Sequence, residues 1–258
     1  MTAYFERLDR ASFRATPAVQ GAWNTAEQHV APALGLLTHC VELDRDSRRV
    51  DDLRVARLSF DILGTLPIGV VDLDVRVLRA GRTIELVGAT LSHNGRAAVV
   101  LRAWLLAPGD TASIAGGDFP TIPAPDDLES WHAEGLWPGE FVRTVDARRA
   151  ETAPGRAQFW LRPGVPLLNG EPISSTARAL SILDIANGIA PRHPPTAVAF
   201  PNLDTTVHLF TEPRGEWLGF DTTVTFGTNG IGLTHSVLHD EHGPIGTMQQ
   251  ILTLRPRA

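Results

Sequence analysis

Two segments of the sequence share one pattern: Gly95-Arg-Ala-Ala-Val-Val-Leu-Arg-Ala-Trp-Leu-Leu-Ala-Pro108 and Gly243-Pro-Ile-Gly-Thr-Met-Gln-Gln-Ile-Leu-Thr-Leu-Arg-Pro256. Each has 14 residues, is rich in apolar side chains, follows a polar turn and ends at a proline. Asn94-Gly95 opens the first segment and predicts a β-hairpin, because a type I′ turn needs positive φ at both central residues. The two segments therefore indicate the last strands of two copies of one folding unit.

The same strands precede each segment. Val71–Ser92 and Gly219–His239 are rich in Thr, Val and Leu, and a glycine turn divides each of them, which predicts a strand pair in each copy. Upstream, Leu58–Leu63 alternates apolar and polar residues with period two, and Leu203–Leu209 does so less strictly. This alternation predicts one further half-buried strand in each copy.

A helical stretch precedes these strands in each copy, at residues 33–41 and 179–187, and both stretches are apolar on nearly every side. Such a helix is a buried one. Between the copies, residues 109–140 are rich in Gly, Pro and Asp, as is typical of a linker. We therefore expect an N-terminal domain at 1–108, the linker at 109–140 and a C-terminal domain at 141–258. The fold class is α+β, with an antiparallel sheet wrapped around a buried helix in each copy.

Composition narrows the function. The chain has 258 residues and a net charge of −6, which argues against nucleic acid as a partner and against a polybasic membrane patch. A single Cys excludes an internal disulfide framework. All 23 basic residues are Arg, which excludes Schiff-base chemistry on lysine and a P-loop. No segment has the pattern of a signal peptide or a spanning helix, so we expect a cytoplasmic protein.

The sequence resembles the acyl-CoA thioesterase II-like family, a group of double hotdog proteins that is common in actinobacteria. The resemblance covers essentially the whole chain apart from the linker. The motifs that carry it are Leu183-Asp-Ile-Ala-Asn-Gly188, Phe200-Pro-Asn-Leu-Asp-Thr-Thr-Val-His-Leu209, Gly215-Glu-Trp-Leu218, Gly243-Pro-Ile-Gly-Thr-Met-Gln-Gln250, Glu27-Gln-His-Val-Ala-Pro-Ala-Leu-Gly-Leu-Leu37 and Arg79-Ala-Gly-Arg-Thr-Ile-Glu-Leu-Val87. The resemblance implies a double hotdog fold and hydrolysis of a fatty or related acyl-CoA, with no cofactor.

A comparison of the two copies singles out three polar residues of the second copy. The alignment sets Asp184 opposite Thr38, Asn202 opposite Arg57 and Gln250 opposite Arg102. The second copy thus has a carboxylate and two amides where the first has none. Asp184 lies among apolar neighbours, and a buried carboxylate needs hydrogen-bond partners or a function.

In the family, an Asp, a Thr and a Gln hold the hydrolytic water. The resemblance assigns these roles to Asp184, Asn202 and Gln250, with Asn202 in place of the threonine, and the choice of Gln250 over Gln249 stays open. Asp184 would act as general base or orient the water, and there is no covalent step. The resemblance also suggests that His29, at the start of the first helix, lines the substrate pocket; the alternative is a structural His.

Other functions remain as alternatives. A non-catalytic acyl-CoA-binding protein would keep the pocket without the chemistry. A hotdog hydratase needs an Asp-x-Asn-Pro-x-His pattern, which the segment after Asp184 lacks, and no Gly-x-Ser-x-Gly elbow supports a serine hydrolase. His235, His239 and His242 do not form a spaced metal-binding set with carboxylates, so we expect no metal. Any further association would most often give a homodimer.

Overall fold

The computed structural model describes residues 3–133 and 135–257. The elements of the first copy are β1 (Phe5–Arg7), β2 (Ser12–Ala15), a 3₁₀ turn (Pro17–Val19), α1 (Val30–Arg48), β3 (Arg54–Ile62), β4 (Val70–Arg79), β5 (Ile84–His93) and β6 (Arg96–Leu106). Two 3₁₀ turns (Ala112–Ile114 and Pro125–Asp127) and β7 (Ser130–Trp131) follow. The elements of the second copy are α2 (Glu140–Arg143), β8 (Val145–Ala153), β9 (Arg156–Pro163), α3 (Ser175–Leu183), α4 (Ala186–Ile189), β10 (Val198–Ala199), β11 (Asp204–Leu209), β12 (Leu218–Phe226), β13 (Ile231–Asp240), β14 (Gly243–Thr253) and β15 (Arg255–Pro256).

The described strands form one large sheet and one small ribbon. The large sheet has 13 strands in the order β1-β2-β4-β5-β6-β3-β11-β14-β13-β12-β9-β8-β7, and all of its strand pairs are antiparallel. The order is nearly symmetrical about the junction of β3 and β11, where the two copies meet with Val207 opposite Leu58. This symmetry confirms the duplication, and the fold is the predicted α+β double hotdog.

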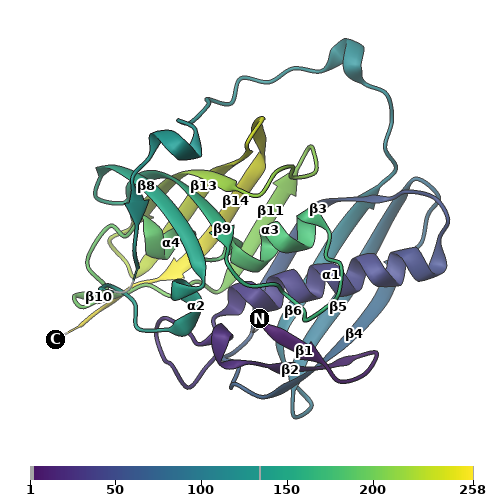
Figure 1. Cartoon of the computed structure of the whole chain (residues 1–258), viewed down its shortest axis with the longest axis horizontal. Coiled ribbons are helices and arrows are strands. Elements are labelled where there is room, and N and C mark those ends of the chain that lie inside the picture. The colour runs from purple at the N-terminus through teal and green to yellow at the C-terminus, as the bar shows by residue number, and fades with distance from the viewer. Residues whose placement is uncertain (1–2, 134, 258) are drawn as a thin grey trace.

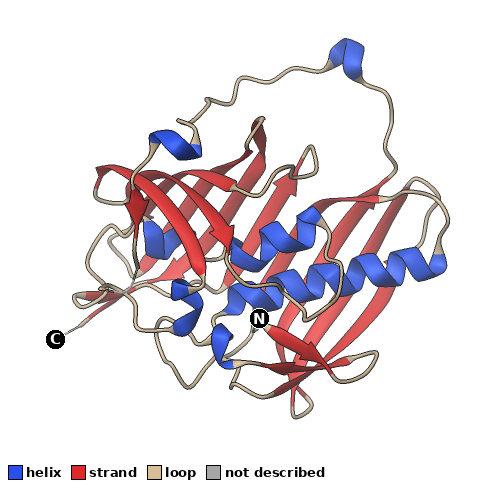
Figure 2. Cartoon of the chain, in the orientation of Figure 1, coloured by secondary structure: helices blue, strands red, loops and turns tan. Residues whose placement is uncertain are grey.

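The two long helices lie side by side on the same face of the curled sheet (Figures 1 and 2). Both α1 and α3 are buried over most of their length, as their apolar composition predicts. Their close approach depends on Gly35. A Cβ at this position would lie 2.6 Å from Cβ of Ser181 and 2.8 Å from the carbonyl oxygen of Ala177. Any larger side chain would push α1 and α3 apart.

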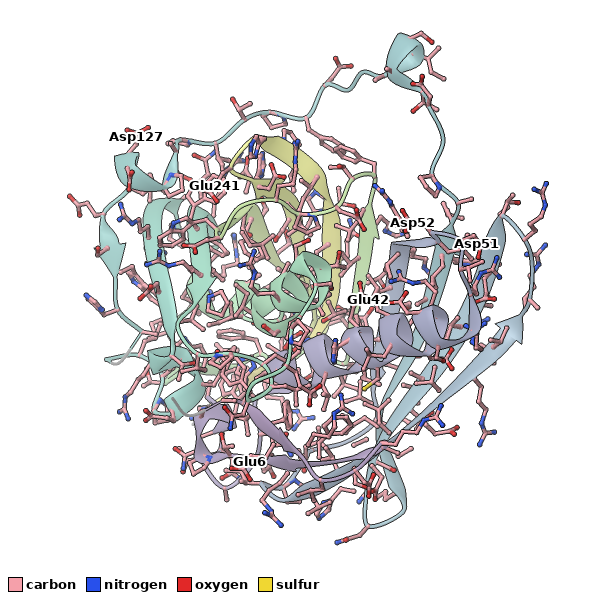
Figure 3. All side chains as sticks on the ribbon, turned by 45° about the vertical axis from the view of Figure 1, so that its right-hand side comes forward. Glu6, Glu42, Asp51, Asp52, Asp127 and Glu241 are labelled. Carbon is pink, nitrogen blue, oxygen red and sulfur yellow. The ribbon has the colours of Figure 1, made fainter. Side chains whose placement is uncertain are left out.

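A polar contact joins the two helices as well. Ser174 Oγ accepts a hydrogen bond from the Ala177 N–H and so caps α3, and the same hydroxyl donates to Glu42 of α1 over 2.6 Å. Figure 3 shows Glu42 on α1 beside the start of α3. Burial raises the pKa of Glu42 to about 7, although the hydrogen bond from Ser174 opposes the shift. The carboxyl group therefore changes charge near neutral pH.

Two expectations about local structure have different outcomes. The turn at Asn94-Gly95 is confirmed, because φ is 51° at Asn94 and 76° at Gly95. The second helix differs from the continuous stretch at 179–187. It begins earlier, at Ser175, breaks after Leu183 and resumes at Ala186. Asp184 occupies the break.

The segment between the copies has two parts. Residues 109–120 are exposed and form the long excursion from the body of the molecule in Figure 1. The part that follows lies against the second copy. Trp160 Nε1 donates to the carbonyl oxygen of Pro123 over 2.7 Å, and β7 extends the sheet beside β8. No helix in the described part of the chain is long and apolar enough to cross a membrane.

Candidate active site

Asp184 is the centre of a buried polar cluster on the inner side of the sheet. It ends α3, with φ −73° and ψ 6°, and its side chain is 3% exposed. Three donors converge on its Oδ1 atom. Asn202 Nδ2 and Thr205 Oγ1 each donate over 2.6 Å, and Gln250 Nε2 donates over 2.7 Å. The structure therefore brings together the three predicted residues Asp184, Asn202 and Gln250.

The environment of Asp184 moves its pKa in two opposing directions. Burial disfavours the carboxylate and is the larger effect, whereas the hydrogen bonds from Thr205, Asn202 and Gln250 favour it. The net result is a pKa raised to about 6. A carboxylate with this pKa is mostly ionised at neutral pH and is still basic enough to accept a proton, which is what general-base catalysis requires.

Within the described part of the chain, the side-chain amide of Gln250 is hydrogen-bonded through its nitrogen only. A carboxylate only accepts hydrogen bonds, so the amide nitrogen faces Asp184 and the oxygen faces away. Gln250 Oε1 is buried and has no hydrogen-bond partner among the described residues. Thr234, opposite Gln250 on β13, also has a buried hydroxyl without a described partner. Two adjacent unsatisfied polar groups are a suitable environment for a bound water.

The structure distinguishes Gln250 from Gln249. Successive side chains of a strand point to opposite faces, so only one of the two can reach the interior. Gln250 is fully buried and contacts Asp184. Gln249 lies on the other face, where its Nε2 is 3.0 Å from His235 Nδ1.

Thr205 is a member of the cluster that sequence reasoning missed. β11 carries Thr205 against the same carboxylate oxygen that Asn202 contacts, so Thr205 is a second candidate for the place of the threonine beside Asn202. The period-two pattern held the missing signal. Thr205 and Val207 share the buried face of β11, and a Thr at a core position needs a hydrogen-bond partner. Thr234 likewise lies on the buried face of β13, where alternation places a Thr at a core position.

Thr205 was overlooked because the sequence alignment of the two copies was one or two residues out of register. The β-bulge that follows Leu91 recurs after Leu238, which is 147 positions further along the chain. At this spacing Thr205 corresponds to Leu58 and Gln250 to Ala103, not to Arg102. Leu58 and Ala103 are opposite one another and fully buried. The first copy therefore has apolar side chains where the second has the polar pair.

His29 lies apart from the hydrogen bonds to Asp184. It caps the start of α1, because its Nδ1 accepts from the Ala31 N–H over 3.2 Å, and its ring lies 4.3 Å from that of Phe141. Burial lowers its pKa to about 3, so the ring is neutral at physiological pH. His29 also lines a small hollow with Ile185 and Asn187, the residues that follow Asp184. In the described residues, no group of three or more His, Cys, Asp or Glu side chains is placed to hold a metal ion.

The fold and the paired copies define the class: a double hotdog protein with a polar cluster in its second copy. The sequence matches the family model of the acyl-CoA thioesterase N-terminal domain over residues 19–106 and that of the C-terminal domain over residues 118–254. The chain therefore belongs to the acyl-CoA thioesterase family, which confirms the resemblance.

Solved structures share the fold. An acyl-CoA thioesterase II, TesB2, from Mycobacterium marinum is 18% identical with a TM-score of 0.67, and the match covers 98% of this chain and 96% of that one. The tesB protein of Mycobacterium avium subs paratuberculosis is 19% identical with a TM-score of 0.65, over 98% and 96% of the two chains. A conserved hotdog protein of unknown function from Alicyclobacillus acidocaldarius is 13% identical with a TM-score of 0.74, over 98% and 96%. No curated protein matches the chain significantly.

Proposed function

We propose that this chain hydrolyses fatty or related acyl-CoA thioesters with a water activated by Asp184. The observation that carries the proposal is the convergence of three donors on one oxygen of a buried carboxylate whose pKa is about 6. The donors fix the orientation of the carboxylate and keep it ionised at neutral pH. Family membership supplies the substrate class, and the buried cluster supports the chemistry.

The reaction needs only water and the thioester. Gln250 Oε1 and the Thr234 hydroxyl are free to bind the water, and Asp184 takes its proton as the oxygen attacks the thioester carbonyl carbon. The tetrahedral intermediate then collapses, the carbon–sulfur bond breaks and the thiol of CoA leaves with the proton from Asp184. The products are the free acid and CoA, and Asp184 returns to its carboxylate form.

Negative charge develops on the carbonyl oxygen during the attack. His29, the N-cap residue of α1, lines a small hollow together with Ile185, which follows Asp184 in the chain. The positive end of the dipole of this 19-residue helix would stabilise the oxyanion. The neutral His29 ring adds no competing charge.

The test is release of free thiol from acyl-CoAs that range from acetyl to palmitoyl, with the wild type, Asp184→Asn and a matched control. Asp221→Asn is that control, because Asp221 lies on the strand β12 outside the cluster, with one long contact of 3.5 Å to Gln158. We expect turnover by the wild type and the control and its collapse in Asp184→Asn. Equal turnover in all three would refute the role of Asp184. Binding of acyl-CoA without thiol release by the wild type would favour a non-catalytic binding protein.

A further inference from the structure

The end of the chain lies against the loop that leads into the site. β15 pairs with β10 in an antiparallel ribbon, with Arg255 opposite Ala199, and the Arg257 N–H donates to the carbonyl oxygen of Ala197 over 2.8 Å. Figure 1 shows β10 at the edge of the molecule, near the C-terminal end of the chain. Phe200 follows β10 directly and is two residues before Asn202. The ribbon therefore holds two arginines close to the polar cluster.

Packed aromatic rings lead from Phe200, two residues before Asn202, to Trp23 at the surface. Phe200 packs edge to face against Trp23, with ring centroids 5.2 Å apart, and Trp137 packs against the same indole at 4.7 Å. Trp23 is still 38% exposed, although its neighbours Phe200 and Trp137 are buried. The guanidinium carbon of Arg257 lies 5.6 Å from the centre of the Trp23 ring. The guanidinium lies over the indole and covers part of its face, and a planar base would stack on the part that stays exposed.

Trp23, Arg255 and Arg257 form a surface region that we call the corner. Its local charge differs from that of the whole protein. The net charge of the chain is −6. Arg255 and Arg257 are nevertheless exposed, and neither forms an ion pair with a carboxylate of the described residues. Many other arginines are paired, such as Arg162 with Asp146 and Glu216. Two unpaired guanidinium groups on one short ribbon are available to bind phosphate.

A small hollow lies between the exposed indole and the segment that follows Asp184 in the chain. Trp23, His29, Asn187 and Gly188 are among the residues that line it. Ile185, which follows Asp184 in the chain, lines the same hollow.

We propose that the nucleotide end of CoA binds at this corner, with its adenine against Trp23 and its phosphates on Arg255 and Arg257. The pantetheine arm then extends from this corner past Ile185 toward Asp184. The inference rests on the proposed thioesterase function and extends it. The chain selects thioesters that carry the nucleotide, and it discriminates against those that have only the short thiol.

The first experiment measures binding without turnover. Isothermal titration calorimetry with adenosine 3′,5′-bisphosphate compares the wild type with an Arg255→Ala/Arg257→Ala double variant. Arg10→Ala is the matched control, because Arg10 is exposed and lies in the first copy between β1 and β2. We expect the Kd to rise about tenfold or more in the double variant and to stay unchanged in the control, since charge-assisted contacts to phosphate are lost. An unchanged Kd in the double variant would overturn the proposal.

The second experiment compares two thioesters of the same acyl group, one with CoA and one with N-acetylcysteamine. We expect the ratio of their kcat/KM values to fall about tenfold in the double variant and in Trp23→Ala, and to fall less in Trp23→Phe, which keeps an aromatic face. A parallel loss for both thioesters would mean that the corner binds the acyl chain and would overturn the proposal. If the wild type hydrolyses neither thioester, the proposed function fails, and the calorimetry still decides this inference.

Discussion

Replacing Thr205 by valine tests the tuning of Asp184 directly. The two side chains have nearly the same shape, so the substitution removes the hydroxyl that donates to Asp184 Oδ1 over 2.6 Å and leaves little empty space. Thr206→Val is the matched control. Thr206 is the next residue of β11 and lies on the opposite face, where its hydroxyl is 3.2 Å from that of Ser59. Both variants lose one hydroxyl, but only one of them loses a contact with the carboxylate.

The size of the effect follows from the lost hydrogen bond. A hydrogen bond to a charged group contributes about 1.5–3 kcal/mol. One pKa unit corresponds to about 1.4 kcal/mol, so the pKa of Asp184 should rise from about 6 by roughly one to two units. The sign is definite, because the hydrogen bond from Thr205 stabilises the ionised form. A general base acts in its carboxylate form, so the variant should lose most activity at low pH, where the raised pKa leaves Asp184 protonated.

The assay is the pH dependence of kcat/KM for thiol release from an acyl-CoA, between about pH 5 and about pH 9. In Thr205→Val, activity should fall roughly five- to fiftyfold near pH 6 and recover at high pH, whereas Thr206→Val should follow the wild type. An acid limb at the wild-type position would refute the reasoning. So would a uniform loss of activity at every pH, which would mean that Thr205 does not act through the pKa of Asp184.

The remaining predictions concern stability. A carboxyl whose pKa is raised on folding holds its proton where the unfolded chain has lost it, so stability falls as pH rises from the unfolded to the folded pKa. For Asp184 this range is 3.8 to about 6, so Asp184→Asn should raise the free energy of unfolding at neutral pH by up to about 3 kcal/mol, measured by urea denaturation. Glu42→Gln should likewise raise the Tm at about pH 8 more than at about pH 5, because the pKa of Glu42 is raised from 4.5 to about 7; an equal change at both pH values would contradict this. Gly35→Ala should destabilise the protein by about 1–3 kcal/mol and lower activity with it, since its Cβ would overlap Ser181 on the helix that ends at Asp184; unchanged thermal unfolding would show that the helices can separate at no cost.

The sequence could reveal the two copies and three members of the site because the relevant signals are local. Strand alternation and apolar helices are read from neighbouring residues, and the repetition of both along the chain indicates a duplicated fold. Asp184 stands out for the same reason, as a charged residue within an apolar helical stretch. Gln250 stands out because the corresponding strand of the first copy has no amide near that position.

The comparison of the two copies could not identify Thr205 and Thr234. An alignment that matched Gly95 with Gly243 was one residue out, and a one-residue slip in a strand exchanges its inner and outer faces. The correct register depends on the turn at Glu241-His242 and on the pairing of β13 with β14, which bring Thr234 opposite Gln250. Register is a property of the pair of strands, and neither strand specifies it alone.

The sequence by itself determined that this protein has two copies of an antiparallel strand unit, each with a buried helix, and that the second copy holds the unusual polar residues. That the strands of both copies join in one sheet came from the structure. Only the tertiary structure decided which of the polar residues meet. The pairing of β11 with β14 and the break at Asp184 bring four side chains from separate segments within hydrogen-bond distance. The physical reason is that a buried carboxylate is stable only where its donors converge in space, and convergence of residues that are distant in the chain arises only when the chain folds.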